Sequence, residues 1–197
     1  MKAKFYKRCL AFIIDIIIVL LISSVIVGFI PMSKVAKKKS DELLKYYNEI
    51  TNDKEVELNE KTLDKLLDLQ YEYDKETIIY SIVTITISVI YYVVYQLKSG
   101  STLGKKLMNI KLKSNNSNKL DANRVVFRCL LINNIGFNII LTIIMMFFSK
   151  NVYFSLAGFI EIFNIIFIII SIFMSAIRKD GRGLHDLIGN TIVVEKS

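Results

Sequence analysis

Proline is nearly absent from this sequence of 197 residues, and Pro31 is its single example. Because proline breaks helices, its rarity leaves the long apolar runs uninterrupted, and Pro31 stands at the end of the first run, where a helix can stop. Apolar residues make up 53% of the chain and gather in blocks, which indicates a membrane protein. Four blocks can cross about 30 Å of hydrocarbon at about 1.5 Å per residue. They are 9–30, 77–97, 129–148 and 152–177.

The first apolar run lacks a signal-peptide cleavage site. Basic residues followed by an apolar run also describe a cleaved signal peptide, but 9–30 is much longer than the usual 7–15 apolar residues and no small-x-small site follows it. We therefore expect 9–30 to be the first of four transmembrane helices.

Acidic residues are scarce in two segments next to the spans. Lysine and arginine cluster before 9–30 and in 98–128, where Asp121 is the only acid, and the positive-inside rule places both segments in the cytoplasm. The loop 31–76 has nine lysines against twelve acids and should face outside. The net charge of +8 thus indicates a lipid bilayer as partner rather than a nucleic acid.

These orientations predict one all-α membrane domain over 1–197, in a bacterial-type plasma membrane and with both termini in the cytoplasm. An outer loop (31–76) would carry small helices, and a cytoplasmic segment (98–128) would carry a short strand. A second cytoplasmic strand would lie in the tail (178–197).

Cysteine and histidine are also rare. Cys9 and Cys129 fall at the predicted cytoplasmic face, where thiols stay reduced, and their spacing matches no metal or redox motif. His185-Asp186 is the only His-Asp pair, and neither a Gly-x-Ser-x-Gly nor a His-Glu-x-x-His motif accompanies it. We therefore expect no cofactor, no metal and no enzymatic activity.

Two acids lie inside the apolar blocks, Asp15 and Glu161. Such an acid costs about 2.5–3.5 kcal/mol on insertion scales and normally faces the protein interior beside a partner. Arg8 shares a helix face with Asp15, but about 10 Å separates them, so each needs partners elsewhere. Arg8 could anchor to lipid phosphates instead. Asp186 is a candidate partner for Arg8 or Arg128 at the inner interface.

Asparagines accompany the second acid. Asn164 lies one helical turn after Glu161, and Asn134 and Asn138 are four positions apart in the third span. Together they suggest a polar interior that could extend an ion path outward from Asp15. The alternative is a set of packing seams, which small and polar residues at this spacing usually form in membranes.

The outer loop contains two amphipathic runs. Ser40 is a candidate cap for the first helix and Asn59 for the second. The pattern predicts a helical cap over the outer face. Both a structural hairpin and a ligand-binding lid fit it.

A glycine segment after the second span superficially resembles a phosphate-binding loop. Gly100 and Gly104 are one residue too close for that motif, and no serine or threonine follows Lys105. This excludes nucleotide binding. A short interfacial helix followed by a strand over 110–113 is expected instead.

The glycine segment recurs after the last span, 81 positions later. We predict a parallel internal repeat with a two-fold axis along the membrane normal, in which strands 110–113 and 191–195 pair. Lys105 and Asp186 would then occupy equivalent sites with opposite charge. The matches include Gly100 with Gly181, Leu103 with Leu184, Asn109 with Asn190, and Arg8-Cys9 with Arg128-Cys129.

Three charged residues follow the order of a known signature. They are Arg8 at the start of the first helix, Asp15 within it, and Asp186 in Gly183-Leu184-His185-Asp186. At these residues the chain resembles the RDD family of membrane proteins, named for one arginine and two aspartates. Gly100-x-Thr102-x-Gly104-Lys105 also resembles the family's turn after the second hydrophobic segment. The resemblance covers most of the chain outside 31–76.

The resemblance implies transport of an unidentified ligand, with sodium/proton exchange attributed to some members. Glu161 is outside the family signature, so an ion path through it would be particular to this chain.

Two functions therefore stay open. In a small transporter or cation/proton exchanger, Asp15 would bind a monovalent cation or proton, and Arg8 and Asp186 would form an inner gate. Because four helices enclose little room, such a transporter would be a homo-oligomer. In an accessory or scaffold protein, Arg8, Asp15 and Asp186 would form a structural ion network that holds the two repeats together.

Overall fold

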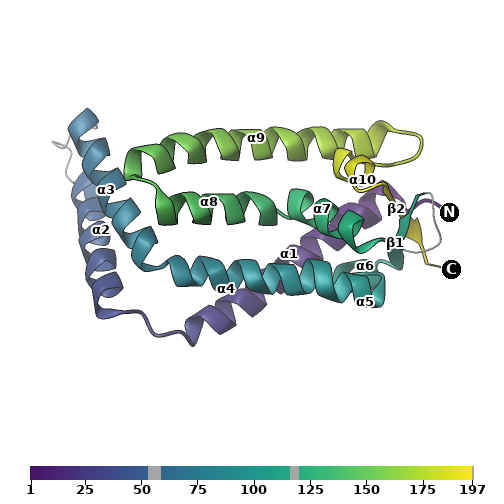
Figure 1. The fold of residues 1–197 in the computed structure, drawn as a ribbon, viewed down its shortest axis with the longest axis horizontal. Helices are drawn as coiled ribbons and strands as arrows, with labels where there is room; N and C mark the ends of the chain where they lie inside the picture. The colour runs from purple at the N-terminus through teal and green to yellow at the C-terminus, as the bar shows by residue number, and fades with distance from the viewer. Residues whose placement is uncertain (53–58, 116–119, 197) are drawn as a thin grey trace.

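The computed structural model describes residues 1–52, 59–115 and 120–196. Long helices run side by side, and both termini lie at one end of the bundle (Figure 1). Within the described residues, three helical segments are long and apolar enough to cross a membrane. They are α1 (Phe5–Gly28), the continuous segment Ile78–Ser99, and α9 (Lys150–Ile177).

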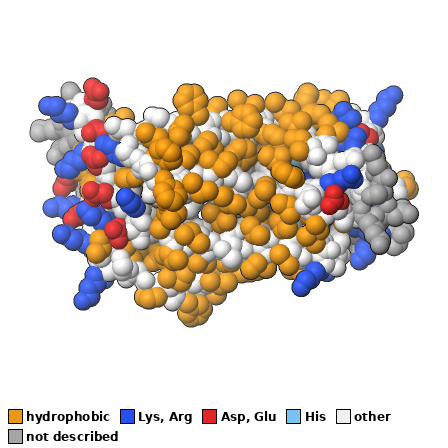
Figure 2. Space-filling model, in the orientation of Figure 1, with side chains coloured by type: hydrophobic (Ala, Val, Ile, Leu, Met, Phe, Trp, Pro, Cys, Tyr) orange, Lys and Arg blue, Asp and Glu red, His pale blue; other side chains and the backbone are white. Residues whose placement is uncertain are grey.

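An apolar belt crosses the middle of the molecule on the face drawn in Figure 2, and charged side chains gather at the two ends. Large apolar side chains on the long helices are exposed, such as Phe159 at 74% and Ile169 at 60%. A soluble monomer rarely exposes so wide an apolar surface. The expected fold class, an all-α membrane protein, is confirmed.

The third apolar block is not the single helix expected over 129–148. Two helices cover this part of the chain, α7 (Ala122–Ile132), which begins before the block, and α8 (Ile135–Phe147), and they are bent by 71° relative to each other. Asn134 between them has φ 59°, a left-handed conformation that asparagine tolerates but that a continuing α-helix excludes. The pair makes a fourth span if it counts as one broken helix.

The second span contains a wider helical turn. It runs through α4 (Ile78–Val89), the π-helix η1 (Ile90–Tyr95) and α5 (Gln96–Ser99). The wide turn brings three consecutive side chains into the interior, Tyr91, Tyr92 and Val93.

The loop 31–76 forms two helices across the end of the bundle opposite the termini (Figure 1). They are α2 (Lys34–Asn52) and α3 (Glu60–Glu76), and the residues between them include 53–58, which lie outside the described part. Asn59 caps α3 as expected, by accepting a hydrogen bond from the Thr62 N–H. Ser40 lies inside α2 rather than at its start, where Ser33 Oγ accepts from the Ala36 N–H.

The same local structure occurs twice at the end with the termini. The helix α6 (Leu103–Leu107) and strand β1 (Ile110–Ser114) recur 81 positions later as α10 (Leu184–Ile188) and β2 (Thr191–Glu195). The predicted strand pairing is confirmed, and it is antiparallel, as a two-fold axis between the strands requires. The backbone repeats at single residues too: φ is 70° at Gly100 and 67° at Gly181, and 54° at Asn109 and 45° at Asn190.

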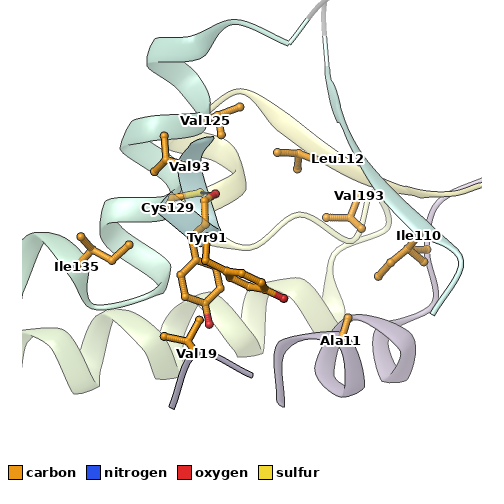
Figure 3. Close-up of a cluster of buried hydrophobic side chains, with 12 residues drawn as sticks. Ala11, Val19, Tyr91, Val93, Ile110, Leu112, Val125, Cys129, Ile135 and Val193 are labelled. Atoms are coloured by element: carbon orange, nitrogen blue, oxygen red, sulfur yellow. Dashed lines mark hydrogen bonds between the residues drawn. The ribbon is translucent and has the colours of Figure 1, made fainter. Parts of the chain in front are cut away.

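The main cluster of buried apolar side chains lies beneath this sheet. Leu112 and Val193 of the two strands, Ala11 of α1, and Val125 and Cys129 of α7 contribute to it (Figure 3). Cys129 is fully buried and its thiol donates to the Tyr92 carbonyl, so its side chain is part of this packing.

Replacing Gly104 with alanine should destabilise the protein. A Cβ at Gly104 would lie 2.8 Å from Asp15 Oδ1 and nearer still to the Ala11 backbone oxygen, so α6 would have to leave α1. We expect a loss of about 1–3 kcal/mol, as for other overpacked sites, seen as a lower melting temperature in detergent. Gly158→Ala is the control, because a Cβ there meets nothing within 4 Å. Equal melting of the two variants would contradict the close approach of α6 to α1.

Candidate functional site

Asp186 of α10 lies between two arginines from different helices. Arg8 Nη2 of α1 is 2.5 Å from Asp186 Oδ2, and Arg128 Nε of α7 is 2.8 Å from Oδ1. The Thr191 hydroxyl donates to Oδ1, the Gly183 N–H donates to Oδ2, and the carboxylate is fully buried. Arg8 also donates to the Gly181 carbonyl. The structure thus brings together three predicted residues, Arg8, Arg128 and Asp186.

The two guanidinium groups fix the charge of Asp186. Burial alone would raise its pKa, but the positive charges of Arg128 and Arg8 outweigh burial and hold the pKa well below its ordinary value. Burial lowers the pKa of the neighbouring His185 to about 3, with Arg128 and Arg8 acting in the same direction. At neutral pH, Asp186 is therefore an anion and His185 is neutral.

Ser171 of α9 completes a polar group that sequence reasoning missed. Its Oγ forms a hydrogen bond with His185 Nδ1 and accepts from the His185 backbone N–H, and His185 Nε2 is 3.4 Å from Asp186 Oδ2. The order serine, histidine, aspartate resembles a hydrolytic triad, but both oxygens of Asp186 are already held by arginines. That the chain is not an enzyme stays a prediction.

The buried Asp15 carboxylate has neutral hydrogen-bond donors as its partners, and no arginine, among the described residues. Its side chain is 2% exposed. The hydroxyls of Tyr91 and Thr102 donate to it at 2.6 and 2.5 Å, and the Gly104 N–H donates at 2.8 Å. The π-helix η1 places Tyr91 here, and α6 brings Thr102 and Gly104. The sequence does contain a signal for Tyr91. Hydroxyl side chains recur in the second span at steps of four and three, which places them on one helix face, at positions 77, 81, 84, 88, 91 and 95.

A cavity of about 300 Å³ connects the two aspartate clusters. Its charged lining residues are Arg8, Asp15, Lys105 and Arg128. The ammonium of Lys105 donates to Gln96 Oε1, and no carboxylate of the described residues lies within 4 Å of it. Burial, and then the charge of Arg128, lower the pKa of Lys105 to about 8. The other lining residues are Phe5, Cys9, Phe12, Ile13, Tyr92, Ile110, Ile132, Asn133, Ile168, Ser171, Ile172, Ser175, His185 and Val193.

The model of the RDD family matches residues 2–190. The chain belongs to the RDD family. No curated protein and no solved structure matches this RDD protein. The arginine and the two aspartates on which the resemblance was based are Arg8, Asp15 and Asp186, and all three lie at or beside the cavity.

The remaining predicted site residues of this RDD protein lie away from the cavity. Glu161 and Asn138 are exposed on the surface of the single chain, and Asn134 and Asn164 are half-buried. The Oδ1 atoms of Asn134 and Asn164 are buried without a hydrogen-bond partner among the described residues. The structure therefore does not join Glu161 and the asparagines to Asp15 in one polar path.

Replacing Asp186 with asparagine should strongly destabilise the RDD protein. Two buried guanidinium groups would lose their shared carboxylate, which costs about 3–5 kcal/mol for a broken buried pair. The control is Asp180→Asn: Asp180 pairs with Arg178 and Arg182 at a more exposed site, where the expected loss is at most about 1 kcal/mol. Melting temperatures in detergent measure both. Similar losses in the two variants would contradict a central role for Asp186.

Stability should also fall as the pH is lowered below 6.5, because of His185. Unfolded His185 takes up a proton near pH 6.5, whereas in the folded state its pKa is about 3. In this window the unfolded state binds more protons, so the free energy of unfolding decreases as the pH is lowered. Between about pH 7 and pH 5, the His185→Gln variant should lose less melting temperature than the wild type. Parallel pH profiles would show that His185 does not contribute.

Proposed function

We propose that this RDD protein is a small membrane transporter and that the cavity is its inner binding site. The observation that carries the proposal is Asp15, a buried carboxylate in a membrane-spanning helix that lines a cavity and has only neutral donors. An ionisable side chain at such a position typically marks an ion or substrate pathway.

The lining favours a proton as the ion at Asp15. The direct partners of Asp15 are hydrogen-bond donors: the hydroxyls of Tyr91 and Thr102 and the Gly104 N–H. Both hydroxyls can turn from donating to accepting, so they can hold the carboxyl group with or without its proton. Exchange of a proton for sodium or potassium is the form of transport to test first.

We place the end with both termini in the cytoplasm of a bacterial-type plasma membrane. Basic residues near both termini and in 98–128 support this orientation, and the acidic helical hairpin at the opposite end would face outside.

A homo-oligomer is part of the proposal. Glu161 is exposed in the apolar belt of the single chain, next to Phe159, Ile162 and Phe163, which are 74%, 59% and 61% exposed. A carboxylate facing lipid is costly, so contact of α9 with a second copy would remove that cost.

A non-transporting accessory or scaffold protein is the second candidate. The observation in its favour is the closed ion network at Asp186, which joins α1, α7 and α10 and leaves both arginines paired. This network alone would explain why an arginine and an aspartate stand at these positions.

Proton flux in vesicles tests the proposal. Purified protein is reconstituted, a sodium or potassium gradient is imposed, and internal pH is followed with a fluorescent dye. We expect wild type to move protons and Asp15→Asn to lose this flux while it still folds, because the amide replaces the carboxylate with little change in shape. Asp180→Asn is the control with unchanged flux. No wild-type flux, or an unchanged Asp15→Asn, would refute the exchanger. Absence of wild-type flux together with lower stability of Asp15→Asn would favour the scaffold.

A further inference from the structure

The cavity contains more positive than negative charge. Arg8 and Arg128 share Asp186, whereas Lys105 has a neutral partner, the Gln96 side chain. Asp15 is the remaining carboxylate, and its hydrogen bonds come from hydroxyls and a backbone N–H. Lys105 is partly buried, and removing a cation from water without a carboxylate partner is unfavourable. The Lys105 side of the cavity therefore favours an anionic ligand.

The walls that lead away from Lys105 are apolar. Phe12 and Ile13 come from α1, and Ile168 and Ile172 come from α9. Ile13 and Ile172 are 51% and 46% exposed, and both lie on helices of the apolar belt. The cavity is thus bordered by side chains that face the hydrocarbon of a bilayer, so a ligand can reach it from the membrane.

We propose that the cavity binds an amphiphile with one anionic headgroup, a phosphate or a carboxylate, that enters from the bilayer between α1 and α9. The headgroup lies near the Lys105 ammonium, and an alkyl chain follows Ile13 and Ile172. The volume of about 300 Å³ accommodates the headgroup and the beginning of one chain, and the rest of the chain stays in the lipid.

This inference does not depend on transport. A bound lipid would compensate the charge of Lys105 equally well in a transporter and in a scaffold. An inorganic anion from the aqueous side shares the headgroup chemistry, so the test has to separate the two sources. The apolar walls and the partly exposed Ile13 and Ile172 favour the lipid.

Native mass spectrometry of the full chain in detergent measures the binding directly. The probes are phosphatidylglycerol, phosphatidylcholine, diacylglycerol and inorganic phosphate. We expect phosphatidylglycerol to be retained in preference to the zwitterionic and neutral lipids. Lys105→Met should weaken this binding about tenfold or more, as expected for the loss of one charge-assisted hydrogen bond. Lys105→Arg should retain it.

Lys106→Met is the matched control. Lys106 is the next residue in α6, its ammonium donates to the Tyr95 hydroxyl at 2.8 Å, and it does not line the cavity. Binding should therefore be unchanged. Equal retention of all three lipids, or equal loss in the Lys105 and Lys106 variants, would overturn the proposal.

A second variant tests the route without removing a charge. Ile172→Trp places a larger side chain at the membrane side of the cavity and should weaken phosphatidylglycerol binding while inorganic phosphate is unaffected. If Lys105→Met does not fold, phosphatidylglycerol binding by Ile172→Trp tests the proposal in its place. Binding of phosphate but not of phosphatidylglycerol would assign the site to a soluble anion and refute the lipid. These measurements need no ion gradient, so their failure is distinct from a failure of proton exchange.

Discussion

The shared contact of Arg8 and Arg128 with the Asp186 carboxylate holds together the end of the protein where both termini lie. Arg8 lies in the first turn of α1 and Arg128 lies within α7, and both reach the one acid in α10. A single carboxylate can serve both only where the halves meet. The antiparallel pairing of β1 with β2 lies at the same end, so strand pairing and ion pairing support each other.

The repeat explains why the cavity is positively charged. The residue of α6 that corresponds to Asp186 of α10 is Lys105. A second acid there would have supplied one carboxylate for each of the two arginines. Lysine instead adds a cation that forms no ion pair with a carboxylate in the described part of the chain, and its neutral partner Gln96 leaves the charge in place. The departure from symmetry, rather than the symmetry itself, gives the cavity its excess of positive charge.

The short helices α6 and α10 are each held by a hydrogen bond from a backbone N–H to a side chain of a long helix, but the accepting residues differ. The backbone N–H of Gly104 in α6 donates to Asp15 of α1, and the corresponding N–H of His185 in α10 donates to Ser171 of α9. In both cases a long helix supplies the acceptor for the first turn of a short one, which would otherwise leave a buried donor unpaired. Gly104 permits the closer of the two approaches. Because the neutral Ser171 hydroxyl accepts the hydrogen bond from α10, accepting the corresponding bond from α6 does not require the negative charge of Asp15.

Much of this arrangement could be predicted from the sequence, because it depends on local patterns. Apolar blocks gave the spans, and matched glycines and asparagines gave the strands and the repeat. Arg8, Arg128 and Asp186 could be brought together because membrane charges need partners. The bend at Asn134 could not be predicted, since one left-handed residue decides it. Nor could the outward position of Glu161, because helical periodicity groups residues on a face without saying which face turns inward.

The two family aspartates differ in the partners that hold them. Asp186 lies between two guanidinium groups, which cannot lose their protons, so neutralising it would leave two buried cations unpaired. Asp15 has two hydroxyl donors, and a hydroxyl can reverse and accept a hydrogen bond from a protonated carboxyl group. Protonation would therefore dismantle the site at Asp186 but preserve most contacts at Asp15. The first aspartate has charged partners that require its negative charge, whereas the second has neutral hydrogen-bond partners.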